Sequence, residues 1–209
     1  MESFINGVVT GLLFLLLPFF AYVLGSVPCG LIVTWIFTSE DIRKTGSGNI
    51  GATNVRRRAG TWAGLLTLAG DIAKGAIPVY LAMQLAGLGT AWREIYIAAI
   101  AVSAFAGHLY PIFMKGKRGG KGVATAGGCF LILSPFSLFI AVLVFILAVC
   151  VSSRVSAGSI AGSLMLPIAV WKATGSGIFT GCAIVIAAGI VLRHQNNIRR
   201  WINGTEPLI

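Results

Sequence analysis

Residues 122–153 read GVATAGGCFLILSPFSLFIAVLVFILAVCVSS and contain no Asp, Glu, Lys or Arg. Three further stretches, 3–39, 95–114 and 173–192, are equally free of these charged residues. About 20 apolar residues in a helix cross the ~30 Å hydrocarbon core of a bilayer, so each stretch is long enough to span it. None shows the period-two alternation of a membrane β-barrel. The sequence therefore predicts an all-α, polytopic membrane helical bundle, formed as a single domain over residues 1–209.

The overall composition supports this class. Of the 209 residues, 56% are hydrophobic and 11% are charged, whereas a soluble domain has about 25% charged residues. The 16 Lys and Arg exceed the 6 Asp and Glu, which gives a formal charge of +10. Such a balance favours anionic lipid or a small anionic substrate as partner. Nucleic acid is not expected, because the basic residues lie in short loops that leave no room for a duplex.

The positions of the basic residues predict the topology, because Lys and Arg collect in cytoplasmic loops. They gather at 43–58, at 115–121, at Arg154 and at 193–200. If these groups are all cytoplasmic, an even number of crossings separates each from the next, so residues 122–153 must cross twice. We expect about seven transmembrane helices, with the N-terminus outside and the C-terminus in the cytoplasm. The expected spans are 3–39, 62–86, 95–114, the two parts of 122–153 on either side of Ser134-Pro135, 157–171 and 177–192.

Two features of this topology stay open. The first part of 122–153 has only about a dozen residues, which suggests a helix that begins inside the membrane plane or tilts little. The break at 25–30 allows either a bend or a reversal, and the count changes by one or two with that choice. Residues 87–93 and 172–177 are the expected outer turns.

The first basic loop, 41–58, is rich in small polar residues and is followed by arginines. Backbone N–H groups can converge in such a loop, and a helix starting near Thr53 would add its positive dipole end. We interpret the loop as a phosphate cradle. The alternative is a flexible glycine-rich turn beside positive-inside arginines. The residues that carry this interpretation are the small polar ones of the turn, those at the expected helix start and an arginine three positions on: Gly46, Ser47, Gly48, Asn49, Gly51, Thr53, Asn54 and Arg57.

A second basic, glycine-rich turn runs directly into an apolar stretch at 116–125, GKRGGKGVAT. It differs from a nucleotide-binding P-loop, since Gly122 follows Lys121 where Ser or Thr would bind magnesium. We expect a second phosphate cradle made of Gly119, Gly120, Lys121 and Gly122. Upstream, His108 is expected to have a structural role through hydrogen bonds.

The last basic segment places two polar residues at membrane level. His194 and Asn197 are three residues apart and share a helical face, although the segment could equally be a snorkelling interfacial helix. Within the spans, Asp71 and Lys74 are expected to form a structural ion pair. Ser156 and Ser159 could bind either backbone or substrate.

Taken together, these stretches resemble the bacterial acyl-phosphate-dependent glycerol-3-phosphate acyltransferases, a family of integral membrane enzymes. The resemblance covers nearly the whole chain. The motifs that carry it are Gly25-Ser26-x-Pro28-x-Gly30, Asp41-x-Arg43-x-x-Gly46-Ser47-Gly48-Asn49-x-Gly51-Ala52-Thr53-Asn54-x-x-Arg57, Asp71-x-x-Lys74-Gly75, Gly107-His108-x-Tyr110-Pro111, Gly119-Gly120-Lys121-Gly122-Val123-Ala124-Thr125, and Arg193-His194-x-x-Asn197-Ile198-x-Arg200 with Gly204-x-Glu206.

The resemblance implies transfer of an acyl group from acyl phosphate to the sn-1 hydroxyl of glycerol 3-phosphate, the first acylation of phospholipid synthesis. The products are lysophosphatidic acid and phosphate. It also implies a bacterial inner-membrane location with the active site facing the cytoplasm. The partners are the two substrates and membrane lipids. No cofactor is expected, and no metal either, because six acidic residues scattered along the chain make no carboxylate site.

Roles follow from the same resemblance. Arg57 neutralises phosphate charge, and Lys121 with its glycines holds the phosphate of glycerol 3-phosphate. His194 is one candidate general base, while an oxygen of the substrate phosphate is the other. Glu206 is expected to tie down the basic tail. The residues assigned to catalysis are His194, Asn197, Arg57 and Ser47, and Ser159 is assigned to substrate binding.

Two alternatives predict different features. A transporter for an anionic phosphorylated solute would have an inverted repeat and a binding site near the membrane midplane, and no such repeat is found in the sequence. An acyltransferase that uses a His and an Asp five residues apart is excluded, because residue 113 is Phe and residue 199 is Arg.

Overall fold

The computed structural model describes residues 2–86, 90–114 and 119–209. Parts of the expected outer turn at 87–93 and of the second basic loop, at Lys115, Gly116, Lys117 and Arg118, lie outside these ranges. Within them, every regular element is helical. The elements in chain order are α1 (Glu2–Gly25), α2 (Cys29–Thr38), η1 (Ile42–Lys44), α3 (Ala52–Ala59), α4 (Thr61–Leu85), α5 (Thr90–Leu109), η2 (Ile112–Met114), α6 (Val123–Leu133), α7 (Pro135–Ser152), α8 (Val155–Thr174), α9 (Gly177–Arg193) and α10 (Gln195–Ile202).

Apolar helices occupy all of the expected span positions. In the described residues, five segments are long and apolar enough to cross a membrane, and α9 with α10 makes a sixth that is bent by 52°. The five are Phe14–Thr38, Thr61–Leu85, Ala91–Met114, Pro135–Ser152 and Val155–Thr174. The remaining apolar helix, α6, is shorter. The chain is thus a multi-pass helical membrane protein, while the count of seven crossings and the orientation of the termini stay predictions.

The structure describes both interruptions whose form the sequence left open, at 25–30 and within 122–153. Residues 14–38 make up one segment that is long and apolar enough to cross a membrane, which favours a bend over a reversal at the interruption between α1 and α2. Ser134 separates α6 from α7, and Pro135 is the first residue of α7, a position that proline tolerates although it cannot continue a helix from within. Because α6 has 11 residues, at 1.5 Å per residue it covers only about half of the hydrocarbon core.

Small residues allow the central helices to approach closely. A Cβ atom on Gly75 of α4 would lie 2.2 Å from the Thr125 carbonyl oxygen of α6, and one on Gly128 would lie 2.0 Å from the Ile72 carbonyl oxygen. Such contacts replace hydrophobic burial as the source of helix association in lipid. Large apolar side chains face outward instead, for example Val151 and Leu15. This inverted distribution is typical of a lipid-exposed bundle.

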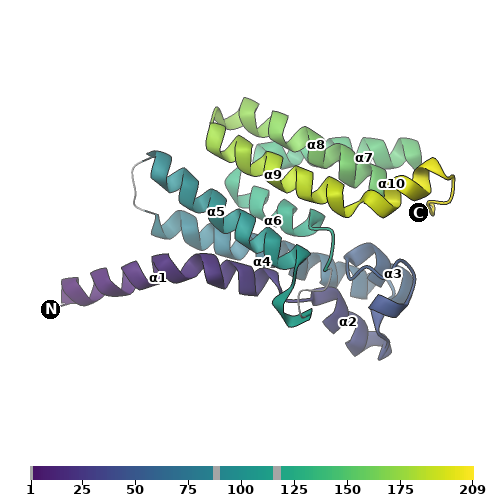
Figure 1. The fold of residues 1–209 in the computed structure, drawn as a ribbon, viewed down its shortest axis with the longest axis horizontal. Coiled ribbons are helices and arrows are strands. Elements are labelled where there is room, and N and C mark those ends of the chain that lie inside the picture. Colours follow the sequence, from purple (N-terminus) through teal and green to yellow (C-terminus); the bar gives the residue numbers. More distant parts are fainter. Residues whose placement is uncertain (1, 87–89, 115–118) are drawn as a thin grey trace.

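The loops that carry the sequence motifs gather at one end of the molecule. Figure 1 shows α2, α3 and α10 with the C-terminal segment at this end, and the start of α1 at the opposite end. The polar motif residues are therefore concentrated at one end of the helical bundle.

Candidate functional site

A cavity of about 760 Å³ lies where the loop before α3, the start of α6 and the segment after α9 meet. Among the described residues, its lining contains four Lys or Arg side chains against two carboxylates, so it suits an anion. The expected site residues that line it are Gly46, Ser47, Asn49, Gly51, Thr53, Asn54, Arg57, Lys121, Gly122, Ser159, His194 and Asn197. One cavity therefore brings together residues from all three basic segments.

The first loop has the conformation that its glycines predict. Gly46 and Gly48 have φ angles of +58° and +68°, which L side chains rarely adopt. The Asn54 amide, which is buried, holds the loop from inside: its Nδ2 donates to the carbonyl oxygens of Thr45 (3.2 Å) and Asn49 (2.9 Å), and its Oδ1 accepts from the Ser47 N–H (3.3 Å). Asn54 thus shapes the loop with the amide that the sequence assigned to phosphate.

Helix α3 begins at Ala52, next to the position expected from the sequence, and its N-cap Gly51 has no side-chain capping bond. Its first turn therefore presents N–H groups and the positive dipole end to the cavity that Gly51 and Ala52 line. One turn later, Arg57 lies at the cavity and donates from Nη2 to the Leu208 carbonyl oxygen at 2.9 Å.

The second loop is held on both sides. The Gly119 N–H donates to the Leu109 carbonyl oxygen at 2.9 Å, and Arg193 donates to the carbonyl oxygens of Gly119 (2.5 Å) and Gly120 (3.1 Å). Gly122, the N-cap of α6, has φ +84°. Of the four residues expected to form the second cradle, Lys121 and Gly122 line the cavity, whereas Gly119 and Gly120 face these neighbours and are not among the described residues that line it.

Gly48 is likewise absent from the described lining. A Cβ atom at this position would lie 3.1 Å from the Arg43 carbonyl oxygen, so Gly48 packs against its own loop.

Lys121 links the second loop to the last basic segment. Its Nζ donates to Asn197 Oδ1 at 2.6 Å. Burial, only partly offset by the charge of Glu206, lowers the pKa of Lys121 to about 8. Lys121 is thus an ammonium group at neutral pH and loses its charge more easily than an exposed lysine.

His194 sits at the break between α9 and α10 and is 1% exposed. Its Nδ1 lies 2.8 Å from the Ile190 carbonyl oxygen. Since a carbonyl oxygen can only accept, Nδ1 carries the hydrogen, and in the neutral ring Nε2 then has the lone pair. This tautomer is the one that a general base acting through Nε2 requires.

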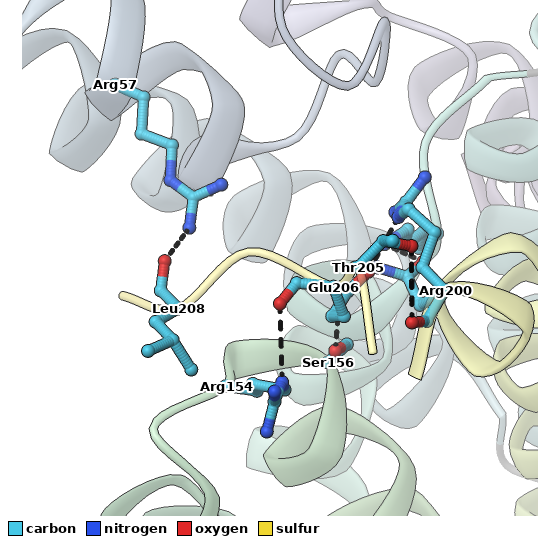
Figure 2. A network of polar contacts seen from close by, with 9 residues as sticks. Arg57, Arg154, Ser156, Arg200, Thr205, Glu206 and Leu208 are labelled. Carbon is cyan, nitrogen blue, oxygen red and sulfur yellow. Dashed lines mark hydrogen bonds and ion pairs between the residues drawn. The ribbon is translucent and has the colours of Figure 1, made fainter. Parts of the chain in front are cut away.

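Glu206 joins three segments (Figure 2). Its carboxylate accepts hydrogen bonds from Ser156 Oγ (2.8 Å) and Asn197 Nδ2 (2.6 Å) and pairs with Arg200 Nε at 2.7 Å. Burial alone would raise the pKa of Glu206, but these three donors hold it below its ordinary value. Glu206 ties the tail as expected and also lines the cavity.

The buried polar residues of the spans form a second group. Asp71 and Lys74 make the expected ion pair at 2.8 Å, and Lys74 Nζ donates to the Val27 carbonyl oxygen at 2.9 Å. His108 Nδ1 lies 3.1 Å from Thr125 Oγ1 and 3.7 Å from Asp71. Asp71 and His108 also line the cavity, a position that their expected structural role did not predict.

The two serines that sequence left open differ in their partners. Ser156 donates to Glu206, whereas Ser159 donates to the Val155 carbonyl oxygen at 2.9 Å and faces the cavity. Lining residues that sequence reasoning did not select are Ala52, Arg58, Leu68, Val123, Ala124, Phe145, Val155, Ser156, Arg200 and Pro207. Their apolar members resemble lipid-facing residues in sequence, so no pattern distinguishes them.

The chain is similar to known proteins along most of its length. The glycerol-3-phosphate acyltransferase family profile matches residues 15–204. A glycerol-3-phosphate acyltransferase of Syntrophotalea carbinolica is 46% identical over 186 residues, covering 89% of this chain and 92% of that protein. One from Geobacter sulfurreducens is 44% identical over 192 residues, covering 92% and 95%.

The same similarity holds in three dimensions. The crystal structure of PlsY (YgiH), an integral membrane glycerol 3-phosphate acyltransferase, in its glycerol 3-phosphate form superposes with a TM-score of 0.87. It is 35% identical and covers 94% of this chain and 95% of that one. Its lysophosphatidic acid form gives a TM-score of 0.83 at 34% identity, with the same coverage. This chain therefore belongs to the glycerol-3-phosphate acyltransferase family and is an acyltransferase of the membrane.

Proposed function

We propose that this chain transfers an acyl group from acyl phosphate to the sn-1 hydroxyl of glycerol 3-phosphate, as one membrane domain. The observation that carries the proposal is the meeting of two glycine-rich basic loops in a single cavity, with Arg57 on one and Lys121 on the other. Both substrates carry phosphate, so the reaction needs two anion sites. The relatives share the acyl acceptor in their names, and the PlsY forms are those of an acceptor and of an acylated product.

The same cavity offers a place for the acyl chain. Leu68 of α4 and Phe145 of α7 line it beside the polar loops. An acyl chain that leaves the cavity between apolar helices stays out of water, which favours this arrangement by about 0.8 kcal/mol per buried methylene.

The reaction is a single displacement at the acyl carbon. The sn-1 hydroxyl oxygen attacks the carbonyl carbon, the bond from that carbon to the phosphate oxygen breaks, and phosphate leaves with the electron pair. The hydroxyl proton goes either to His194 Nε2 or to a phosphate oxygen of the substrate. Acyl phosphate is an activated mixed anhydride. The protein therefore needs only to position the substrates and to stabilise charge, through Lys121 and Arg57.

The deciding experiment compares acyl donors. Purified protein is incubated with glycerol 3-phosphate and palmitoyl phosphate, palmitoyl-CoA or palmitoyl-acyl carrier protein, and lysophosphatidic acid is quantified by mass spectrometry. We expect product with palmitoyl phosphate and little with either thioester. Comparable turnover with a thioester would contradict the choice of donor, and absence of product with all three would contradict the function.

Location belongs to the same proposal. We propose the bacterial inner membrane, with the N-terminus outside and the cavity facing the cytoplasm, because the basic loops meet at the cavity and positive residues remain cytoplasmic. The test introduces Lys172→Cys or Asn203→Cys into a chain with Cys29 and Cys150 replaced by Ser. An impermeant maleimide added to intact spheroplasts is expected to label only the first variant. The reverse pattern would contradict the orientation.

The transporter alternative loses its support here. Most of the cavity lining comes from loops and from the ends of helices, at one end of the bundle, whereas a transporter site lies near the membrane midplane.

A further inference from the structure

Arg193, the last residue of α9, contacts a loop that lies more than seventy residues earlier in the chain. Its Nε donates to the Gly120 carbonyl oxygen at 3.1 Å, and its Nη2 donates to the Gly119 carbonyl oxygen at 2.5 Å. The guanidinium carbon also lies 5.9 Å from the centre of the Tyr110 ring, a cation–π distance. One planar group therefore holds two successive carbonyl groups and is itself fixed by an aromatic ring.

These two bonds determine where the neighbouring N–H groups point. No described peptide bond is cis, and in a trans peptide the C=O and the following N–H point in opposite directions. With the Gly119 and Gly120 carbonyls turned toward Arg193, the N–H groups of Gly120 and Lys121 must point away from it. The orientation of these donors thus depends on the guanidinium group.

The same loop also rests on the end of α5. A Cβ atom on Gly119 would lie 2.2 Å from the His108 carbonyl oxygen, and one on Gly120 would lie 2.0 Å from His108 Nε2. His108 is itself 2% exposed and bonded to Thr125. The loop is therefore held both by Arg193 and by the end of α5, with no room to shift toward α5.

We propose that Arg193 is the positioning residue of the second phosphate cradle. By fixing the peptides on either side of Gly120, it sets the direction of the Lys121 N–H and the starting point of the Lys121 side chain, and Lys121 lines the cavity. Arg193 acts through the loop and does not contact substrate. The inference rests on the proposed function, because it assigns this loop to the phosphate of glycerol 3-phosphate.

The test is the effect of Arg193→Gln and Arg193→Lys on each kinetic parameter. Loss of two charge-assisted bonds should raise KM for glycerol 3-phosphate by about ten- to a hundredfold. The kcat and the KM for palmitoyl phosphate should change by less than about threefold, because the loop binds ground state and transition state alike. Arg193→Lys should recover only part of the loss, since an ammonium group cannot bridge two carbonyls in one plane. Arg199→Gln, which changes an exposed arginine on α10, is the matched control and should leave all three parameters unchanged.

Thermal unfolding in detergent separates positioning from folding. A variant with a wild-type Tm and a raised KM supports the proposal. An unchanged KM in Arg193→Gln overturns it, and so does a joint fall of Tm, kcat and both substrate affinities. If Arg193→Gln does not fold, Arg193→Lys provides the same comparison.

A binding measurement keeps this inference separate from the reaction itself. Calorimetric titration of glycerol 3-phosphate into wild type and Arg193→Gln needs no acyl donor. Weaker binding in the variant supports the positioning role even if the donor assignment fails, and equal binding contradicts it. No binding to wild type at all contradicts both the inference and the proposed function.

Discussion

The Lys121 amine donates a hydrogen bond to Asn197 Oδ1 at 2.6 Å, and this bond joins residues that are 76 positions apart. Asn197 in turn donates from Nδ2 to Glu206 Oε1 at 2.6 Å. The oxygen and the nitrogen of the Asn197 amide are therefore both hydrogen-bonded. Asn197 orients the Lys121 amine, and Glu206 in turn fixes the orientation of Asn197. Removing one member leaves its neighbour with an unmatched polar group in a buried place.

The protonation of Lys121 should control substrate binding at alkaline pH. Its pKa is lowered to about 8 by burial, and the charged form that attracts phosphate is the one present below this pKa. We expect kcat/KM for glycerol 3-phosphate to fall as the pH rises through about 8. Lys121→Arg should remove this fall, because the pKa of arginine is above about 12. A pH profile from initial rates measures it, and an unchanged alkaline limb in Lys121→Arg would refute the assignment.

Lys121 and Arg57, two of the four basic residues that line the cavity, should differ in the kinetic parameter that they change. Lys121→Ala should raise KM for glycerol 3-phosphate, whereas Arg57→Ala should lower kcat, because we propose that Arg57 stabilises charge on the departing phosphate. Each charge-assisted bond is worth roughly 1.5–3 kcal/mol, or about ten- to a hundredfold. Arg57→Lys should recover little.

Steady-state kinetics with both substrates varied tests this division. Arg56→Ala is the control, since Arg56 is an exposed neighbour on α3 that is not part of the described cavity lining. If Lys121→Ala and Arg57→Ala both give folded, fully active enzyme, the two-cradle model is wrong. The basic residues of the loops then only set the orientation of the chain in the membrane.

His194→Ala distinguishes the two proton acceptors. If the Nε2 lone pair accepts the proton, the loss in kcat should be several hundredfold, within the range of about 10²–10⁴ for general acid–base catalysis. The acidic limb of the pH–rate profile should also disappear. A small loss with that limb intact assigns the proton to the substrate phosphate.

Gly120→Ala should damage the second loop by steric conflict alone. The added Cβ would lie 2.0 Å from His108 Nε2, and His108 is buried and cannot move aside freely. Overpacking of this kind costs about 1–3 kcal/mol, so both Tm and affinity for glycerol 3-phosphate should fall. Gly181→Ala on α9, where a Cβ meets nothing within 4 Å, should change neither.

The double variant Gly120→Ala with His108→Ala checks the cause. Its loss should be smaller than the sum of the two single losses, because the smaller side chain makes room for the methyl group. Additive losses would show that the conflict lies elsewhere.

The charge-free stretches are a local pattern and predicted the membrane class. The meeting of the basic loops followed instead from their shared cytoplasmic side and from the family resemblance. The sequence did not predict which apolar residues face the cavity. Leu68 and Phe145 are apolar, as are side chains that face lipid. Only the packing of the helices distinguishes cavity-lining residues from lipid-facing ones.

Polar contacts between segments far apart in the chain could not be predicted from the sequence either. The bonds from Arg193 to Gly119 and Gly120 connect distant segments without any periodicity. The bonds of the Asn54 amide to the loop backbone were not predicted either, although Asn54 does line the cavity as expected for a residue near phosphate. A phosphate motif in sequence does not distinguish residues that bind phosphate from residues that shape the loop.

The segment after α10 has a consequence for biogenesis. Chains are synthesised from the N-terminus, so all spans can enter the bilayer before Glu206 and Leu208 leave the ribosome. A polypeptide that stops at Asn203 would retain every span yet lack the carboxylate that joins Ser156, Asn197 and Arg200. Membrane insertion and completion of the cavity wall are thus separate events, and the second depends on codons beyond the last membrane helix.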